Sequence, residues 1–327
     1  MTIVVTGAAG FIGSHVAAAL LDRGETVLGL DNLNDYYSVA LKEARLARLS
    51  ARPGFRFIKA DVSDRAAIEA LAPDFAEATG MVHLAAQAGV RYSLENPYAY
   101  VDANVTGQVA MLEAARRMPK LKHFVYASTS SVYGANKKMP FSVEDRVDSP
   151  MSIYAATKKA AEMMTYAYCH LYKFPATGLR FFTVYGPWGR PDMAAYLFAD
   201  AIMAGRPIRV FNEGRMKRDF TFVEDIAAGV LAALDRPAKP DVNGAPHAVY
   251  NLGNNRTEDL MRFIGIIEDA LGRKAVKQME PLQAGDVPET SADIEASRRD
   301  LGYEPTTAID VGLPRFVAWY KDYHGIA

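Results

Sequence analysis

The chain holds one cysteine, Cys169, among its 327 residues, and no Cys/His cluster has the spacing of a zinc site. A single cysteine cannot form an internal disulfide, which fits a reducing compartment. Free cysteines are usually buried, so we expect Cys169 to be a helix packing residue. These absences predict a cytoplasmic protein without a bound metal.

Long apolar segments and a surplus of one charge are absent as well. No apolar run reaches the ~20 residues that a membrane-spanning helix requires, and the first residues lack the charged and then apolar layout of a signal peptide. The 37 Lys and Arg residues nearly balance the 38 Asp and Glu residues, which gives a net charge of -1. We therefore expect neither nucleic acid nor membrane as a partner, while a local anion site stays open.

Short apolar runs and helical stretches alternate in the first half of the chain. This alternation predicts an α/β fold with a doubly wound parallel sheet, whose strands are continuously apolar because helices cover both faces. The expected strands are 2–7, 26–31, 55–61, 80–86, 122–128 and 176–182, and the expected helices are 11–24, 38–50, 64–73, 97–117 and 152–173.

The pattern changes after about residue 185, where "YGPWGRPDM" is rich in turn formers. The expected elements there are the helices 192–204, 257–271 and 308–322, the strand 208–211 and the loop 212–220. The helix 223–235 and the strand 248–254 have the character of the first half and are expected to return to it. We predict that residues 1–183, with return segments near 222–253, form one domain and that 184–327 form mainly a smaller, interleaved α/β domain.

Three glycines follow the first strand directly and open the first helix. Gly7, Gly10 and Gly13 lie in "TGAAGFIG", with the spacing G-x-x-G-x-x-G. Glycines at a strand–turn–helix junction let the backbone approach a pyrophosphate, whose charge the helix N-terminus favours. This context predicts a Rossmann-like dinucleotide-binding domain, with a simple glycine turn as the alternative.

Two acids follow the next two strands. Asp31 ends the second strand, near the offset at which an acid binds the adenosine ribose, and its alternative role is that of a helix cap. A carboxylate at this place repels a 2′-phosphate, so Asp31 favours NAD over NADP. Asp61 follows the third strand, where it either accepts a hydrogen bond from the adenine amino group or caps the next helix.

Tyr154 and Lys158 form a Y-x-x-x-K motif within an expected helix, so both side chains share one face. An ammonium near a phenol favours the phenolate and lowers the tyrosine pKa from about 10 toward neutrality. Such a tyrosine is a general base for a substrate hydroxyl while hydride leaves for a nicotinamide. The motif is common on surface helices, but here it follows a glycine loop and a strand that ends in four hydroxyl residues, Ser128 to Ser131.

These features resemble the extended short-chain dehydrogenases/reductases that act on nucleotide sugars, and longer segments are similar to the UDP-glucuronate 4-epimerases. The similar segments cover nearly the whole chain and include "NLNDYYSVALKEARLARL", "HLAAQAGVRYSLENPYAYVDANVTG", "YAATKKAAE", "LRFFTVYGPWGRPDM", "FNEGRMKRDFTFVEDI" and "GDVPET". The resemblance implies a tightly bound NAD+ that is regenerated in each turnover. It also implies that C4 of UDP-glucuronate is oxidised to a ketone and that hydride returns to the opposite face, giving UDP-galacturonate reversibly.

The resemblance assigns individual residues. It makes Tyr154 the base, Lys158 its partner and a ligand of the nicotinamide ribose, and Thr129 the hydroxyl that bridges the sugar 4-OH and the phenol. It further implies a homodimer that packs the helices 97–117 and 152–173. The expected cofactor-binding residues are Gly7, Gly10, Phe11, Ile12, Gly13, Asp31, Asn32, Asp61, Val62, Leu84, Ala85, Ala86, Asn104, Tyr154 and Lys158.

The hydroxyl row contains no carboxylate, which bears on the expected reaction. By resemblance, relatives that dehydrate nucleotide sugars carry Asp-Glu in place of Ser130 and Ser131, and those that decarboxylate UDP-glucuronate carry Glu in place of Ser131. A glucuronate oxidised at C4 is a β-keto acid, which loses CO2 readily when its carboxylate lies perpendicular to the carbonyl plane. We expect Ser130, Ser131 and Thr183 to hold the carboxylate away from that geometry without repelling it, with turn or capping roles as the alternative.

The remaining substrate contacts are also expected by resemblance. Arg190 and Arg218 are expected to bind the pyrophosphate and Arg91 to lie near the sugar, because arginines make strong hydrogen bonds to phosphate. Phe211 is expected near uracil and Asp286 near the ribose hydroxyls. Their alternatives are surface charge, interdomain salt bridge, core packing and loop structure. The rival functions are a UDP-glucose/galactose 4-epimerase, another nucleotide-sugar dehydratase or decarboxylase, and a non-catalytic NAD-binding protein.

Overall fold

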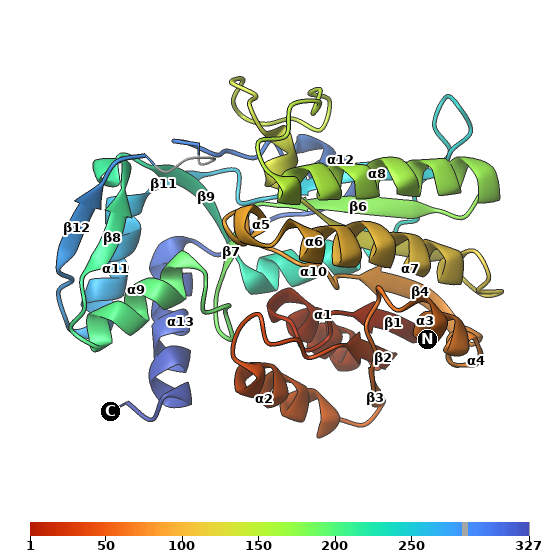
Figure 1. Ribbon diagram of the computed structural model, residues 1–327, viewed down its shortest axis with the longest axis horizontal. Helices are drawn as coiled ribbons and strands as arrows, with labels where there is room; N and C mark the ends of the chain where they lie inside the picture. Colours follow the sequence, from red (N-terminus) through yellow and green to blue (C-terminus); the bar gives the residue numbers. More distant parts are fainter. Residues whose placement is uncertain (283–286, 327) are drawn as a thin grey trace.

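The larger lobe of the protein is built on a seven-stranded sheet in the order β10-β6-β5-β4-β1-β2-β3, with every neighbouring pair parallel (Figure 1). The computed structural model describes residues 1–282 and 287–326. The expected doubly wound parallel sheet is thus confirmed. Its strands are β1 (Thr2–Thr6), β2 (Thr26–Asp31), β3 (Phe55–Lys59), β4 (Ala78–His83), β5 (His123–Thr129), β6 (Ala176–Phe181) and β10 (His247–Leu252).

Helices cover both faces of this sheet, which explains the continuously apolar strands. Ile3 and Val5 of β1 pack in one core cluster with Val16 of α1, whereas Val4 between them packs in a second cluster with Met111 of α7. The helices of this lobe are α1 (Phe11–Asp22), α2 (Val39–Ser50), α3 (Arg65–Ala70), α4 (Ala72–Phe75), α5 (Tyr92–Glu95), α6 (Pro97–Val101), the π-helical η1 (Asp102–Thr106), α7 (Gly107–Ala115), the 3-10 helix η2 (Ser130–Tyr133), α8 (Ile153–Tyr172), α10 (Val223–Leu234) and α12 (Glu295–Leu301).

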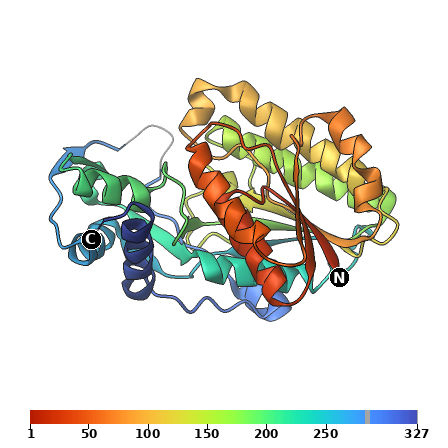
Figure 2. The same cartoon turned by 90° about the horizontal axis from the view of Figure 1, so that it is seen from below.

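A smaller lobe lies beside the sheet and ends the chain (Figure 2). Phe220 stacks on Phe263 at 4.0 Å between ring centroids, and both belong to one buried apolar cluster with Phe316. Two small sheets, β11-β9-β7 and β12-β8, carry this core. Its elements are β7 (Thr183–Tyr185), α9 (Ala194–Met203), β8 (Ile208–Phe211), the 3-10 helix η3 (Asn212–Gly214), β9 (Lys217–Phe222), β11 (Thr257–Asp259), α11 (Leu260–Leu271), β12 (Lys277–Glu280) and α13 (Ile309–Tyr323).

The structure corrects several expected elements. Residues 217–220 begin β9 instead of ending a loop, and residues 257–259 form β11, which pairs antiparallel with β9, instead of the first turn of a helix. β7, β12 and α12 were not expected. The polar stretches 217–220 and 257–259 become strands because partners are available to pair with them, a tertiary effect that overrides local preference. The expected helix 64–73 is split at Leu71 into α3 and α4.

Two further findings concern the lone cysteine and the possibility of a membrane-spanning helix. Cys169 is fully buried on α8, as expected of a packing residue. Among the helices within residues 1–282 and 287–326, none is long and apolar enough to cross a membrane.

The contact between α13 and the small sheet gives a test of the smaller lobe. A methyl group added at Gly312 would lie 2.2 Å from the Tyr185 hydroxyl oxygen and 2.8 Å from a ring carbon of Phe222, and both side chains are buried. Gly312→Ala is therefore expected to lower the melting temperature, since overpacking costs about 1–3 kcal/mol. Gly265→Ala on α11 is the matched control, because nothing lies within 4 Å of its added methyl and alanine gains up to about 1 kcal/mol in a helix. Equal rises in both variants would contradict the packing described.

Candidate active site

A cleft of about 680 Å³ opens at the carboxyl ends of the parallel strands. β1 lies between β4 and β2. The chain runs from β1 through β2 and β3 to one edge of the sheet, and later from β4 through β5 and β6 toward the other edge. Ligands of open α/β sheets bind at such a switch point. The expected site residues that line this cleft are Gly7, Gly10, Phe11, Ile12, Gly13, Asp31, Asn32, Asp61, Val62, Leu84, Ala85, Ala86, Thr129, Ser130, Ser131, Tyr154, Lys158, Thr183 and Arg190.

Asn104 lies behind the cleft and not on its wall. It is buried in the π-helical segment η1, a kind of distortion that often occurs near functional sites. Its side-chain amide accepts from the backbone N–H of Gln87 at 2.9 Å, and donates to the Gln87 carbonyl at 2.9 Å and to the Thr157 hydroxyl at 3.1 Å. Asn104 therefore holds the loop after β4 against α8.

Three expected substrate residues stand apart from the lining of the cleft. The Arg91 guanidinium lies 5.0 Å from the centroid of the Phe211 ring. Arg91, expected near the sugar, and Phe211, expected near uracil, therefore contact each other between the lobes. Arg218 donates to two backbone carbonyl oxygens, one of its own strand and one of Pro288, at 3.0 Å each. Asp286 lies outside the described residues.

The glycine loop has the geometry of an anion site. Gly7 adopts a φ of +70°, and a methyl group added at Gly13 would lie 2.0 Å from the Gly7 carbonyl oxygen, so this tight turn requires glycine. The loop opens onto the N-terminus of α1, whose first turn carries no acidic side chain. Asp31 accepts from the backbone N–H of Ala9 at 3.1 Å, which fixes its carboxylate beside the loop.

The structure tests one of the two expected roles of Asp61, the helix cap. Asp64 is the residue that caps α3, because its carboxylate accepts from the backbone N–H of Ala67 at 3.0 Å. Asp61 instead accepts from Asn32 at 2.8 Å and from the backbone N–H of Ser63 at 2.8 Å, on the wall of the cleft. The capping role of Asp61 is therefore excluded.

Tyr154 and Lys158 line the cleft from the first two turns of α8. Burial lowers the pKa of Lys158 to about 8, and the negative charge of Glu162 opposes this shift. Burial raises the pKa of Tyr154, while a hydrogen bond with Thr129 and the charge of Arg190 oppose it. The expected lowering of the tyrosine pKa is therefore wrong for this structure, because the loss of solvent around the phenol outweighs the effect of its neighbours.

The hydroxyl row, Ser128 to Ser131, begins with buried residues and ends with partly exposed ones at the cleft. Ser128 is buried and donates to Glu162 at 2.7 Å, whereas Ser130 and Ser131 are partly exposed at the start of η2. The Thr129 hydroxyl donates to the Ser131 hydroxyl and accepts from the Ser131 backbone N–H, at 3.2 Å each. Thr129 thus caps η2 and lines the cleft at once, so the capping alternative and the site position are both present.

An acid–aromatic group beside Arg190 was not anticipated from the sequence. Asp192 accepts from the Arg190 guanidinium at 3.0 Å and from the Tyr36 hydroxyl at 3.1 Å. Burial alone would raise the pKa of Asp192, but the charge of Arg190 holds it below its ordinary value. Tyr36 and Asp192 both lie in segments that resemble the 4-epimerases, yet their pairing across 156 residues is invisible in the sequence.

A second unanticipated residue, Arg45, joins the glycine loop to the loop that carries Arg190. Its guanidinium is fully buried and donates to the Ala9 carbonyl at 3.1 Å, to the Trp188 carbonyl at 2.7 and 3.0 Å, and to the Tyr37 hydroxyl at 2.7 Å. In the sequence Arg45 is one of several charged residues on an expected helix, with no signal of burial.

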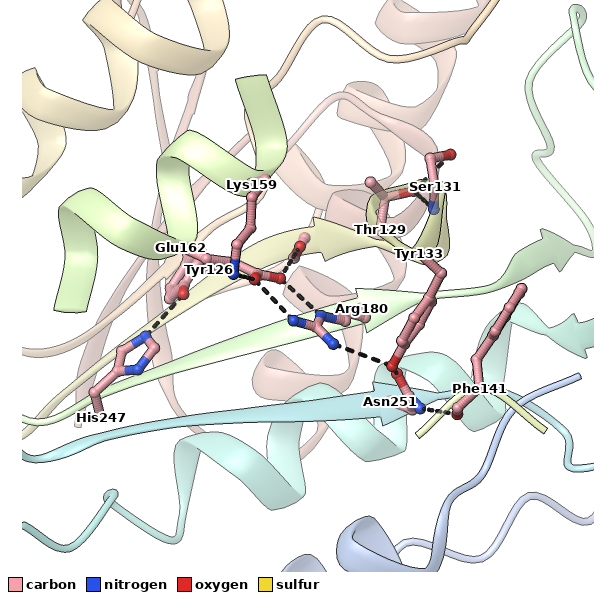
Figure 3. A network of polar contacts seen from close by, with 11 residues as sticks. Tyr126, Thr129, Ser131, Tyr133, Phe141, Lys159, Glu162, Arg180, His247 and Asn251 are labelled. Atoms are coloured by element: carbon pink, nitrogen blue, oxygen red, sulfur yellow. Dashed lines mark hydrogen bonds and ion pairs between the residues drawn. The ribbon is translucent and has the colours of Figure 1, made fainter. Parts of the chain in front are cut away.

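A buried ion pair lies under the hydroxyl row and was also missed. Glu162 and Arg180 are each 3% exposed and form two hydrogen bonds with each other, as Figure 3 shows. Glu162 follows Lys158 by four residues, so its position on the same helix face was readable. Its partner on β6 was not.

Comparison with known proteins identifies the family. The model of the NAD dependent epimerase/dehydratase family matches residues 3–253. The chain belongs to this family. A probable UDP-glucuronate 4-epimerase of Rhizobium meliloti (strain 1021) is 48% identical over 332 residues, which cover 98% of this chain and 97% of that protein.

The chain is also similar to solved structures of two epimerases. The UDP-glucuronic acid 4-epimerase of Bacillus cereus, in complex with UDP-glucuronic acid and NAD, is 34% identical with a TM-score of 0.89, covering 99% of this chain and 100% of that one. The UDP-glucose 4-epimerase of Thermotoga maritima, with UDP-glucose, is 27% identical with a TM-score of 0.87, at the same coverage.

The cleft fits the dinucleotide of the epimerase/dehydratase family. The loop at Gly7 and Gly13 offers a close approach to a pyrophosphate, and the Asp31 carboxylate lies beside it for a ribose. The cleft is continuous from this loop to Tyr154 and Lys158, and its volume suits a large ligand. Within residues 1–282 and 287–326, no group of His, Cys, Asp and Glu is arranged to hold a metal ion.

The buried ammonium of Lys158 gives a direct test of the site. We expect Lys158 to titrate near pH 8 in the cofactor-free protein, because burial lowers its pKa to about 8. Competitive acetylation of the lysines between about pH 6 and 11, read by peptide mass spectrometry, measures the midpoint of each residue. Lys274 is the control, since hydrogen bonds with Asp269 and Glu268 raise its pKa. A midpoint for Lys158 as high as that of Lys274 would contradict its burial in the described state.

Proposed function

We propose that this protein catalyses the reversible, NAD-dependent C4 epimerisation of UDP-glucuronate to UDP-galacturonate. The observation that carries the proposal is the content of the cleft: Tyr154, Lys158 and Thr129 share it with three neutral hydroxyl groups. Those groups belong to Ser130, Ser131 and Thr183. The names of the relatives and the complex with UDP-glucuronic acid support the same substrate. A fold of this kind can also serve a non-catalytic binder, but such a protein has no use for the Tyr–Lys–Thr set.

The residues of the chain divide the work of proton transfer. When bound, NAD supplies the acceptor and then the donor of the C4 hydride. We propose that Tyr154 takes the proton of the sugar 4-hydroxyl, with Thr129 bridging the two oxygens, and later returns it. Burial disfavours both the phenolate of Tyr154 and the ammonium of Lys158. We propose that the two opposite charges, formed in the same cleft, offset part of this cost for each other.

The proposed cofactor contacts follow the same cleft. The glycine loop at Gly7 and Gly13 would hold the pyrophosphate, Asp31 the adenosine ribose, and Lys158 the nicotinamide ribose. Asp31 and Asp61 make two carboxylates near the expected adenosine end, which supports NAD over NADP as the ligand. Asn104 is proposed to act from behind, by holding the loop after β4.

The carboxylate of the sugar is proposed to bind the hydroxyls of Ser130, Ser131 and Thr183. Thr183 opens β7 and lines the same cleft as the other two. Hydroxyl donors hold a carboxylate without the repulsion that Asp or Glu would introduce. They would also keep the carboxylate of the 4-keto sugar away from the geometry in which CO2 leaves.

The rest of the substrate is proposed to bind toward the smaller lobe. Arg190 lines the cleft and shares its charge with Asp192, so a pyrophosphate there would compete with that pairing. Arg218 and the Arg91–Phe211 contact lie outside the cleft lining and would close on the uridine part.

We also propose a division of labour and an assembly. Residues 1–183 with 222–253 would bind the cofactor, and 184–327 mainly the nucleotide sugar. A homodimer would pack the segments 97–117 and 152–173 of each protomer, and the exposed apolar side chains of Tyr98 and Val101 on α6 and of Met163 and Leu171 on α8 support it. A cytoplasmic location is proposed from the single, buried thiol.

The function is tested with purified protein and UDP-glucuronate. UDP-galacturonate is the expected product, identified by NMR, and it should form without added NAD+ because the cofactor is regenerated within each turnover. UDP-glucose in competition serves as the control for the rival 4-epimerase activity. Accumulation of a UDP-pentose, or preferential turnover of UDP-glucose, would refute the proposal.

The hydroxyl contacts are tested with Ser130→Ala and Thr183→Ala. Each variant is expected to release CO2 from UDP-glucuronate on the order of tenfold faster than the unmodified protein, because one hydrogen bond to the carboxylate is lost. Release of CO2 and formation of the UDP-pentose measure this directly. UDP-glucose, which has no carboxylate, is the internal control for general damage. Unchanged epimerisation without CO2 release in both variants would exclude a carboxylate-holding role.

A further inference from the structure

The carboxylate of Glu162 is buried one helical turn beyond Lys158, and the proposed chemistry does not use it. Arg180 on β6 binds it with two hydrogen bonds, from Nε at 2.8 Å and from a terminal nitrogen at 2.9 Å, and Ser128 adds a third at 2.7 Å (Figure 3). Lys159 reaches it from the partly exposed side at 3.3 Å. The closest partners of the carboxylate, Arg180 and Ser128, thus belong to the neighbouring strands β6 and β5.

The network continues from Arg180 to the other end of the hydroxyl row. Arg180 donates to the Tyr133 hydroxyl at 3.1 Å, and that hydroxyl donates to Asn251 on β10 at 2.7 Å. Asn251 in turn donates to the backbone carbonyl of Phe141 at 2.8 Å. Figure 3 shows Arg180 between Glu162 and Tyr133, with the Thr129 and Ser131 side chains above them.

Within and beyond the hydroxyl row, Ser128 and Tyr133 lie on either side of the residues Thr129 to Ser131. Ser128 precedes Thr129 at the end of β5, and Tyr133 ends the 3-10 helix η2 that begins at Ser130. The ion pair therefore binds the chain on both sides of Thr129 to Ser131. Glu162 accepts a hydrogen bond from Ser128, and Arg180 donates one to Tyr133. The same carboxylate belongs to α8, the helix that carries Tyr154 and Lys158.

We propose that Glu162 and Arg180 are positioning residues, which hold the hydroxyl row 129–131 at a fixed distance from Tyr154 and Lys158. This inference rests on the proposed epimerase function for its kinetic consequences. Buried ion pairs recover their desolvation cost only when the geometry is good and the remaining hydrogen bonds are made, and here both conditions are met. Such a pair gives little stability but a unique arrangement of the parts it joins, which proton transfer requires.

The charges around Lys158 agree with this role. Glu162 on its own helix opposes the effect of burial on the pKa of Lys158, and His83 on β4 faces Lys158 as a neutral ring, since burial lowers the pKa of His83 to about 3. Arg180 and Lys159 surround Glu162 with positive charge. Removing the carboxylate would take away the negative charge that opposes the effect of burial on the pKa of Lys158.

The test compares Glu162→Gln with Asp235→Asn. Asp235 also binds an arginine through two hydrogen bonds, from Arg23 at 2.9 Å each, but on the exposed surface between α1 and α10. For Glu162→Gln we expect kcat for UDP-glucuronate to fall by about tenfold or more with KM changed less than about threefold, because the transition state depends on the geometry that is lost. The alkaline limb of its pH profile should move to lower pH. Asp235→Asn should change neither.

The result that overturns the proposal is a folded Glu162→Gln protein with kcat within about twofold of the unmodified enzyme and an unmoved pH profile. If Glu162→Gln does not fold, Ser128→Ala decides, because it frees one end of the row and leaves the ion pair intact. A lower kcat at unchanged KM supports the proposal, and unchanged kinetics refute it.

Failure of the function and failure of this inference are distinguishable. The titration of Lys158 by competitive acetylation needs no sugar nucleotide, and its midpoint should fall in Glu162→Gln but not in Asp235→Asn. An unchanged midpoint in Glu162→Gln counts against the inference even if the enzyme acts on another substrate. A lowered midpoint without turnover of UDP-glucuronate counts against the function alone.

Discussion

Two opposite charges, buried between α8 and β6, determine how the parts of the site lie together. Glu162 and Arg180 cannot leave each other without exposing an unpaired charge to the core, which costs several kcal/mol. Ser128 binds the pair from β5 and Tyr133 binds it from η2, so the end of the strand, the turn after it and the helix are fixed as one unit. The proposed general base and the hydroxyls that face it therefore belong to one rigid framework.

A second buried charge joins the glycine loop to the loop that carries Arg190. Arg45 donates its hydrogen bonds to the carbonyl oxygens of Ala9 and Trp188 and to the hydroxyl of Tyr37. The glycine loop and the loop before Arg190 thus share one cation.

Features that depend on neighbours in the sequence were predictable, and features that depend on distant partners were not. The glycine loop and the spacing of Tyr154 and Lys158 are local, and so are the apolar strands of the large sheet. The pairing of Glu162 with Arg180 joins different elements, and β9 is a strand only because β7 and β11 pair with it. The predicted lowering of the Tyr154 pKa was wrong for the same reason, because the burial of a side chain is a property of the folded chain.

The ion pair of Glu162 and Arg180 helps to explain why the hydroxyl row carries no charge. The negative charge near the row comes from Glu162, under Ser128, and Arg180 already balances it. The surface that Ser130 and Ser131 present to the cleft is thereby left without net charge, so it would not repel the acidic sugar that we propose as the substrate. A carboxylate in place of Ser131 would meet the Thr129 hydroxyl, which now lies 3.2 Å from the Ser131 oxygen, and would compete for the proton that Thr129 is proposed to pass on. The same substitution that would repel the substrate would thus also interrupt the relay.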